Sequence, residues 1–274
     1  MNTSLSAVKP LAACVVAGIV WLSSPNLAIA QTTPPAATSN SQVVVAPNAA
    51  LPQLQRQVLV PFRATYSVTR NGSPAGVASM QVIDLGSGRW RLDLGIRGTQ
   101  GLAGLAGLNL QQSTVFERVG DVFRPISQAT VKNLLLRSQR ITGTYDWSRN
   151  SAHWSGDVSS KRRAPVALQA GDMNALLVNL AVVRDADASK PLQYRVVDNG
   201  RARLQAFATS AAKEVVTVGD LSYDAWHVSR TNAGNDGMDA WVSDNVPTPV
   251  RIVQKDSDTG TLELLLTDYK GPAK

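Results

Sequence analysis

The sequence predicts a mainly β fold: a curved antiparallel meander that forms an open or closed barrel with one principal helix. Apolar and polar residues alternate with a period of two through most of residues 61–270, as in strands with one buried face. Gly, Asn and Asp turns interrupt this alternation at short intervals, and only residues 172–184 have helical spacing. One helix cannot cover so many strands, so the sheet must curl, with the helix plugging or flanking its concave face.

The strands before the helix follow from this alternation. Phe62, Ala64, Tyr66 and Val68 alternate with polar residues, and Asn71-Gly72 then predicts a tight hairpin. Further strands are predicted at 77–85, 89–97, 110–118, 122–131, 136–147, 151–157 and 163–168. Strands of this length joined by short turns indicate a meander.

The helix and the later strands complete the domain. Asp172 is placed to cap the start of the helix, and Arg184 falls in its last turn. The helical spacing is that of Met173, Leu176, Leu177, Leu180 and Val183. Strands resume at 192–196, 201–209, 213–218, 222–231, 238–243, 249–256 and 261–269. We expect a single β-rich domain over residues 61–270.

The first thirty residues have the pattern of a secretory signal peptide. Lys9 precedes an apolar run from Leu11 to Leu22, and the small-residue site Ala28-Ile29-Ala30 follows. The run is shorter than the ~20 residues that a membrane span needs. We therefore expect cleavage after Ala30 and a periplasmic location, with residues 31–60 forming a disordered linker rich in Pro, Ala and Thr.

Two alternatives remain for the N-terminal segment: an uncleaved anchor, and lipid attachment at Cys14. Cleavage before Cys14 would leave the apolar residues 15–22 at an exposed N-terminus, which disfavours lipidation. Cleavage after Ala30 removes Cys14, the only cysteine, and with it any disulfide or thiol chemistry.

The formal net charge is +7, but the basic residues are scattered apart from the cluster Lys161-Arg162-Arg163. A nucleic-acid-binding protein would need a basic stripe or a known module, so we expect no nucleic-acid partner. In an envelope compartment the charge either meets anionic lipid head groups at a membrane surface or keeps the protein soluble.

No motif points to catalysis, a cofactor or a metal. His153 and His227 are far apart on predicted strands, with no carboxylate beside either at the spacing of a metal motif. The loop around Asp236, Asp239 and Asp244 lacks the ligand spacing of a calcium site and predicts a polar hairpin tip. We therefore predict no catalytic residue, no metal ligand and no enzyme.

One apolar segment, residues 101–110, stands apart because Leu and Gly alternate in it without any charge. Leu102, Leu105 and Leu108 recur every third residue, and the glycines between them weaken both helix and strand. The segment is either a loosened part of the core or a pliable lip at the mouth of the barrel. As a lip, these three leucines would bind a lipid or touch a membrane surface.

The C-terminal third resembles an exported bacterial family catalogued as domain of unknown function 3108, and the similarity extends over most of residues 61–270. The residues that carry it are Trp241-Val242-Ser243-Asp244, Pro247, Pro249-Val250-Arg251-Ile252, Gly260, Leu262, Leu264 and Tyr269, with Phe62, Tyr66, Gly72 and Gly76 at the opening hairpin and the segments 101–110 and 172 onwards between them. The resemblance implies an exported β-rich fold with no established activity. In style this fold is similar to the curved-sheet carriers of periplasmic lipoprotein trafficking.

Together these observations favour a non-enzymatic periplasmic protein whose curved sheet holds or passes a hydrophobic ligand, such as an acyl chain or a lipid. The alternative is an envelope assembly factor that binds a protein partner through a strand edge or its basic surface. An enzyme of unknown type is the third possibility.

Overall fold

The computed structural model describes residues 59–100, 109–134, 137–234, 236–257 and 260–271. Within these residues, fifteen strands, one 3-10 turn (η1) and one α-helix (α2) follow one another. Their bounds are β1 Phe62–Arg70, β2 Ser73–Gly86, β3 Arg89–Gly98, β4 Asn109–Val119, β5 Val122–Leu134, β6 Arg137–Asp146, β7 Ser151–Gly156, η1 Ser160–Arg162, β8 Val166–Ala167, α2 Val178–Asp185, β9 Leu192–Asp198, β10 Arg201–Thr209, β11 Glu214–Val218, β12 Leu221–Arg230, β13 Gly237–Ser243, β14 Arg251–Asp256 and β15 Gly260–Lys270.

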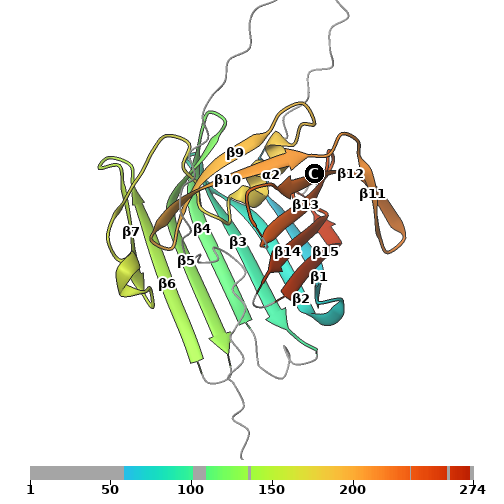
Figure 1. Ribbon diagram of the computed structural model, residues 1–274, viewed down its shortest axis with the longest axis horizontal. Coiled ribbons are helices and arrows are strands. Elements are labelled where there is room, and N and C mark those ends of the chain that lie inside the picture. The colour runs from blue at the N-terminus through green and yellow to red at the C-terminus, as the bar shows by residue number, and fades with distance from the viewer. Residues whose placement is uncertain (1–58, 101–108, 135–136, 235, 258–259, 272–274) are drawn as a thin grey trace, which may run out of the picture.

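All the strands belong to one antiparallel sheet that curls into a nearly closed barrel (Figure 1). Its order is β8-β7-β6-β5-β4-β3-β2-β1-β15-β14-β13-β12-β10-β9, with β11 paired to β12. Sequence neighbours pair as in a meander, and β1 also pairs with the last strand, with Arg63 opposite Lys270. The predicted fold class, a mainly β antiparallel barrel with one principal helix, is confirmed.

The core lies inside the curved sheet because alternate residues of each strand point inward. In β1 the inward residues Phe62, Ala64, Tyr66 and Val68 are all buried, as their alternation predicted. The Tyr66 hydroxyl lies 2.6 Å from Thr248 Oγ1 and 3.1 Å from the carbonyl oxygen of Pro249. The first strand is thereby linked to the connection between β13 and β14.

Tight Asn-Gly turns join two of the hairpins. Asn71 and Gly72 between β1 and β2 have φ angles of 49° and 78°, and Asn199 and Gly200 between β9 and β10 have 47° and 71°. Such left-handed pairs match the twist of a two-residue hairpin. The Asn71-Gly72 turn falls where the sequence predicted it, and Asn199-Gly200 falls between the predicted strands 192–196 and 201–209.

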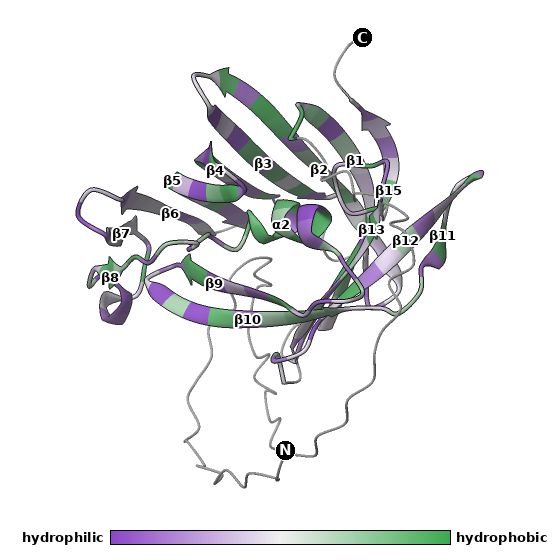
Figure 2. Ribbon diagram, turned by 90° about the horizontal axis from the view of Figure 1, so that it is seen from above, coloured by the Kyte–Doolittle hydropathy of each residue, from purple (hydrophilic) through white to green (hydrophobic). Residues whose placement is uncertain are grey.

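Helix α2 lies inside the barrel, between the β1–β3 side and the β9–β13 side (Figure 2). Six of its residues, Val178 to Val183, are buried. It therefore plugs the concave face, one of the two positions that the sequence allowed.

The helix starts later than predicted, and the cap at Asp172 is wrong. The backbone of Met173 bonds to the free edge of β9, with its N–H 3.2 Å from the Arg195 carbonyl oxygen and its own carbonyl 2.8 Å from the Val197 nitrogen. This pairing keeps the chain extended, so a helix cannot begin there. Asp172 instead accepts the N–H of Gln169 at 2.7 Å and forms an ion pair with Arg195.

The two ends of the sheet meet at a seam that side chains hold together. Gln128 of β5 donates through Nε2 to Asp198 Oδ1 at the end of β9, at 2.7 Å. Its Oε1 accepts from Asn174 Nδ2 at 3.1 Å and lies 2.5 Å from the hydroxyl of Tyr145. The Tyr145 hydroxyl is also 2.8 Å from the carbonyl oxygen of Val197. Residues of the two ends thus share one buried polar network.

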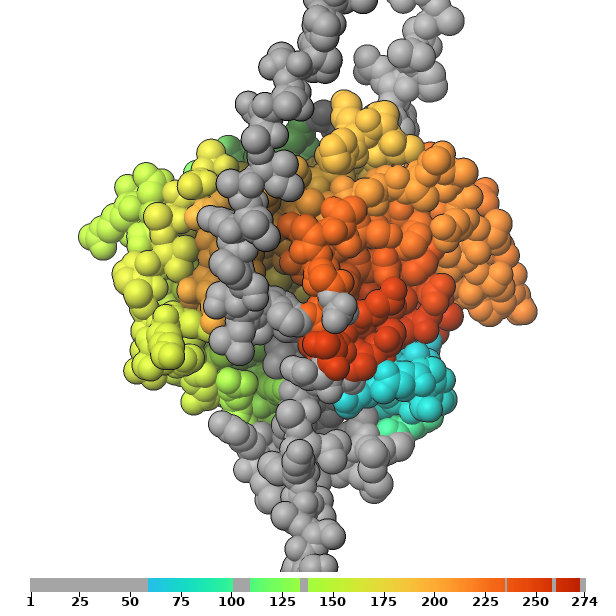
Figure 3. Space-filling view, in the orientation of Figure 1, coloured from blue at the N-terminus to red at the C-terminus, as the bar shows by residue number. Residues whose placement is uncertain are grey.

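A second, smaller hydrophobic cluster packs beside this seam. It contains Tyr145, Ala152, Trp154, Val158, Leu168 and Val197. Here β6 to β8 pack against the face of β9 that points away from the main core. In the space-filling view the region of β7 and β8 and the region of β11 to β15 form opposite sides of the visible face (Figure 3).

The predicted strand 163–168 is mostly wrong. The turn η1 ends at Arg162, just before this segment, and within the segment only Val166–Ala167 pair as β8. Pro165 has no N–H to donate to a ladder, which shortens the strand. The turn also packs tightly on the β9–β10 hairpin, since a Cβ on Gly200 would lie 2.1 Å from the carbonyl oxygen of Arg162.

Candidate functional site

A cavity of about 110 Å³ lies between α2, the β9–β10 hairpin and the inner faces of β3, β4, β13 and β14. Its apolar lining comes from Leu94, Ala175, Leu176, Val178, Val196 and Met238. These side chains belong to the same inward faces that form the core. The plug helix and the curled sheet together therefore leave a partly apolar space inside the barrel.

Four arginines line the other part of this cavity: Arg162, Arg201, Arg203 and Arg230. We call them the arginine cluster. Arg201 and Arg203 are two residues apart on β10, so they point to the same face as the buried Phe207. Arg162 ends η1, and Arg230 ends β12 opposite Phe207.

The arginine cluster is held close together in partly buried surroundings. Burial lowers the pKa of Arg203, and the neighbouring guanidiniums of Arg201, Arg162 and Arg230 lower it further. Burial and the charge of Arg201 likewise lower the pKa of Arg162. Like charges in such proximity disfavour one another's charged form. The cavity is therefore a site of concentrated positive charge.

Two carboxyl groups also line the cavity. Burial raises the pKa of Asp198, and hydrogen bonds from Gln128 and from the backbone N–H groups of Ala175 and Asn199 oppose this rise only in part. Asp236 is buried and accepts the N–H of Ser257 at 2.6 Å through Oδ1. Among the described lining residues, the four arginines thus share the cavity with two carboxyl groups, whereas the ammonium group of Lys255 pairs with Asp239.

Some polar atoms of the cavity wall lack partners among the described residues. Gln112 is 8 % exposed, and its Oε1 accepts no hydrogen bond there. The same holds for Oδ1 of Asn199. Buried polar atoms are normally paired, so atoms of this kind in a cavity wall are available to a bound molecule.

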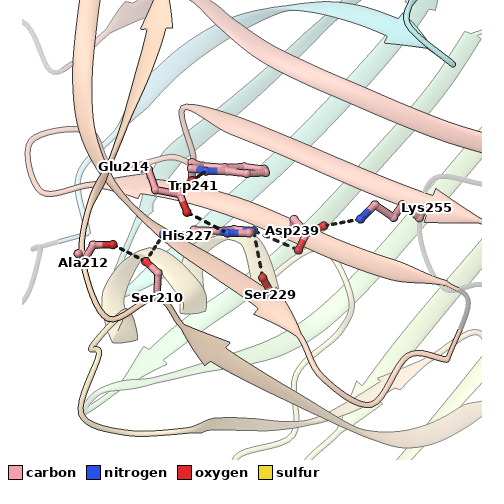
Figure 4. Close-up of polar contacts among 8 residues, drawn as sticks. All are labelled: Ser210, Ala212, Glu214, His227, Ser229, Asp239, Trp241 and Lys255. Carbon is pink, nitrogen blue, oxygen red and sulfur yellow. Dashed lines mark hydrogen bonds and ion pairs between the residues drawn. The ribbon is translucent and has the colours of Figure 1, made fainter.

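His227 lies on the outer face of the barrel, in a cross-strand ladder (Figure 4). Its ring stacks on Trp241, with centroids 4.3 Å apart, and Arg251 lies over the same indole at 4.5 Å. Its Nε2 is 3.2 Å from Asp239 Oδ1, and its Nδ1 is 3.4 Å from Glu214 Oε1. The sequence places no carboxylate beside His227 at the spacing of a metal motif, and both carboxylates come instead from the neighbouring strands β11 and β13.

Further polar contacts link the residues around His227 to one another. Ser229 lies 3.0 Å from His227 Nε2, Lys255 pairs with Asp239 at 3.3 Å, and Trp241 donates to Glu214 at 2.8 Å. Within the described ranges, no three His, Cys, Asp or Glu side chains cluster as a metal site. The ladder therefore supports the strand register of β12 and β13.

The three aspartates of the suspected calcium loop are separated in the structure. Asp236 faces the cavity, Asp239 belongs to the outer ladder, and Asp244 pairs with Lys213. His153 is an exposed residue of β7. The three candidate ligand-binding residues Leu102, Leu105 and Leu108 lie outside the described residues.

The arginine cluster was missed in the sequence. The sequence placed Arg162 only in the basic cluster Lys161-Arg162-Arg163, and it predicted no role for Arg201 or Arg203. Their signal is the period of two that they share with Phe207, which places arginines at inward positions of a strand.

The fold and the cavity define a class: a barrel-like β domain with a helix plug and a basic internal cavity. The chain belongs to the family described as protein of unknown function DUF3108, whose model matches residues 65–267. Among solved structures it is similar to a β-barrel-like protein of domain of unknown function DUF1849 from Brucella abortus. That similarity has a TM-score of 0.50 at 12 % identity and covers 79 % of this chain and 99 % of the other, which shows a shared fold.

A comparison with curated proteins found no match. No helix among the described residues is both long enough and apolar enough to cross a membrane.

Proposed function

We propose that this domain is a non-enzymatic, exported periplasmic protein that binds a hydrophobic ligand, such as an acyl chain or a lipid, inside its barrel. The observation that carries the proposal is the cavity beside α2, whose apolar wall includes Leu94, Leu176 and Val196. Ligand sites are typically concave, mostly apolar and lined by a few polar groups.

The size of the cavity limits what it holds. About 110 Å³ is below the ~300 Å³ at the lower end of pockets for drug-sized molecules. It therefore accommodates one end of a lipid rather than the whole molecule. The remainder of the ligand would extend past the rim or require the seam to widen.

Filling the cavity tests the proposal. A Met238→Trp variant places a large side chain into the space, and Gln205→Trp does so from β10. We expect at least one folded variant to lose binding of a fluorescent fatty acid, with Leu204→Trp on the exposed face of β10 as the matched control. Fatty-acid binding equal to that of the wild type in both folded cavity variants would contradict the proposal.

The Leu-Gly segment extends the proposal to the mouth of the barrel. If Leu102, Leu105 and Leu108 form a lip, Leu105→Asp leaves the melting temperature nearly unchanged and abolishes uptake of the fluorescent fatty acid. Unfolding of the variant would indicate a core segment, because a buried unpaired carboxylate is strongly destabilising.

The β11–β12 hairpin favours the alternative, an assembly factor that binds a protein. It projects from the body of the barrel (Figure 1), and Val215 and Leu221 are 67 % and 61 % exposed. A photo-crosslinking residue at Val215 should trap an envelope protein if this alternative holds, whereas the same residue at Arg89 serves as the control.

A further inference from the structure

We infer that the arginine cluster is an anion site that takes the phosphate or carboxylate group of a ligand whose apolar part lies against α2 and β3. This inference rests on the proposed ligand-binding function and names the chemical class of the ligand: an anionic amphiphile. The sequence predicted a hydrophobic ligand in the barrel, placed anionic lipid head groups only at a membrane surface, and assigned no residue to bind an anion.

The first support is the convergence of the four side chains. They come from three separate elements, η1, β10 and the end of β12, yet all of them line one cavity. The close approach of the Arg162 backbone to Gly200 fixes η1 against the β9–β10 hairpin. The cluster is therefore built by the fold.

The second support is electrostatic. Burial and the charge of Arg201 lower the pKa of Arg162, and burial together with the charges of Arg201, Arg162 and Arg230 lowers that of Arg203, so like charges gather in the cavity. An anionic group between the guanidiniums would relieve the repulsion.

The third support is the chemistry of the wall. Guanidinium groups bind carboxylate and phosphate oxygens through paired N–H donors in a planar fork. Gln112 Oε1, which is buried and lacks a partner among the described residues, can accept a hydrogen bond from a protonated phosphate or a ligand hydroxyl. Leu94 and Leu176 line the same space for the adjoining apolar chain.

The test compares three probes on the full chain by calorimetric titration: oleoyl lysophosphatidic acid, the neutral monooleoylglycerol, and inorganic phosphate. We expect Arg162→Gln and Arg203→Gln to weaken lysophosphatidic acid binding at least about tenfold. Monooleoylglycerol binding should change less than about twofold. Arg89→Gln, an exposed arginine on β3, is the matched control and should leave all three probes unaffected.

Two further readouts separate binding from folding. Arg162→Gln removes a repelled charge, so its melting temperature should equal or exceed that of the wild type, whereas loss of a structural ion pair would lower it. In the wild type, added NaCl should weaken binding of lysophosphatidic acid but not of monooleoylglycerol. The salt comparison needs no variant.

The outcomes distinguish this inference from the proposed function. Equal binding of the charged and neutral lipids, independent of salt and of both arginines, overturns the anion site and leaves lipid binding standing. Arginine-dependent binding of inorganic phosphate without binding of either lipid supports the anion site and overturns the lipid function. Binding of none of the three probes overturns both.

Discussion

At the scale of single residues, Asp198 and Asp239 have pKa shifts of opposite sign. Burial raises the pKa of Asp198. Burial also acts to raise that of Asp239, but hydrogen bonds from Ser229, His227 and Lys255 and the Lys255 charge outweigh it and lower the pKa. Folding therefore favours the protonated form of Asp198 and the ionised form of Asp239.

These shifts predict opposite pH dependences for two matched variants. The stabilisation from Asp198 is fully present below the ordinary aspartate pKa of about 3.9. It is lost as the pH rises from there through the raised pKa of the folded state. The stabilisation from Asp239 is present above the ordinary pKa of about 3.9, and it is lost as the pH falls through the lowered pKa of the folded state. We expect the difference in the free energy of unfolding between the wild type and Asp198→Asn to shrink with rising pH. The difference between the wild type and Asp239→Asn should grow with rising pH, and urea unfolding measures both. Parallel pH profiles would contradict both assignments.

Tyr66 offers a second residue-scale prediction. Tyr66→Phe keeps the buried ring but removes the hydroxyl that contacts Thr248 and Pro249. We expect a loss of ~1–2 kcal/mol in the free energy of unfolding, because buried polar atoms remain without this partner. Tyr223→Phe, on the partly buried Tyr223 of β12, is the control and should change stability by less than about 0.5 kcal/mol.

At the scale of elements, the two Asn-Gly hairpins are a matched pair. Ala at Gly72 or Gly200 must adopt a left-handed conformation, which costs about 1 kcal/mol. Only at Gly200 would the new Cβ meet a neighbour, the Arg162 carbonyl oxygen, whereas nothing lies within 4 Å at Gly72. We expect Gly200→Ala to cost a further ~1–3 kcal/mol in chemical unfolding. Equal losses in the free energy of unfolding for Gly72→Ala and Gly200→Ala would show that η1 can move away from the new side chain at no cost.

The elements also show what the sequence can predict. Period-two alternation located the strands well, because one buried face imposes that pattern directly, as in β1 and β3. Local patterns failed for the helix start at Asp172, which rested on helical spacing, and for the strand at 163–168, which rested on alternation. There the conformation depends on the distant edge of β9 and on the turn against Gly200, and neither leaves a local pattern.

At the scale of the whole molecule, the site was less predictable than the fold. Arg162, Arg203 and Arg230 are dispersed in the sequence, and only the curling of the sheet brings them to one cavity. The partners of His227 were hidden for the same reason, since Asp239 and Glu214 lie on neighbouring strands. A curved sheet was predictable; which inward residues would meet across it was not.

The seam predicts how the barrel opens. Gln128→Met keeps a similar volume but removes the groups that bond to Asp198, Asn174 and Tyr145. We expect the free energy of unfolding to fall by ~2–4 kcal/mol and amide hydrogen exchange to become faster in β9. Exchange in β1 to β4 should remain unchanged. Gln111→Met, at an exposed position of β4, is the control. Uniformly faster exchange in all strands would argue against a local opening.

The pairing of β1 with β15 has a consequence for folding kinetics. Neighbouring strands form from short loops, but Arg63 meets Lys270 only after almost the entire domain has been ordered or brought together. Such a contact has a high sequence separation, and contacts of this kind slow folding. A ribosome or an export channel that releases the chain from its N-terminus would hold the first strand without one of its two neighbours until synthesis or transfer is nearly complete. Closure of the barrel is thus set by when the last strand arrives.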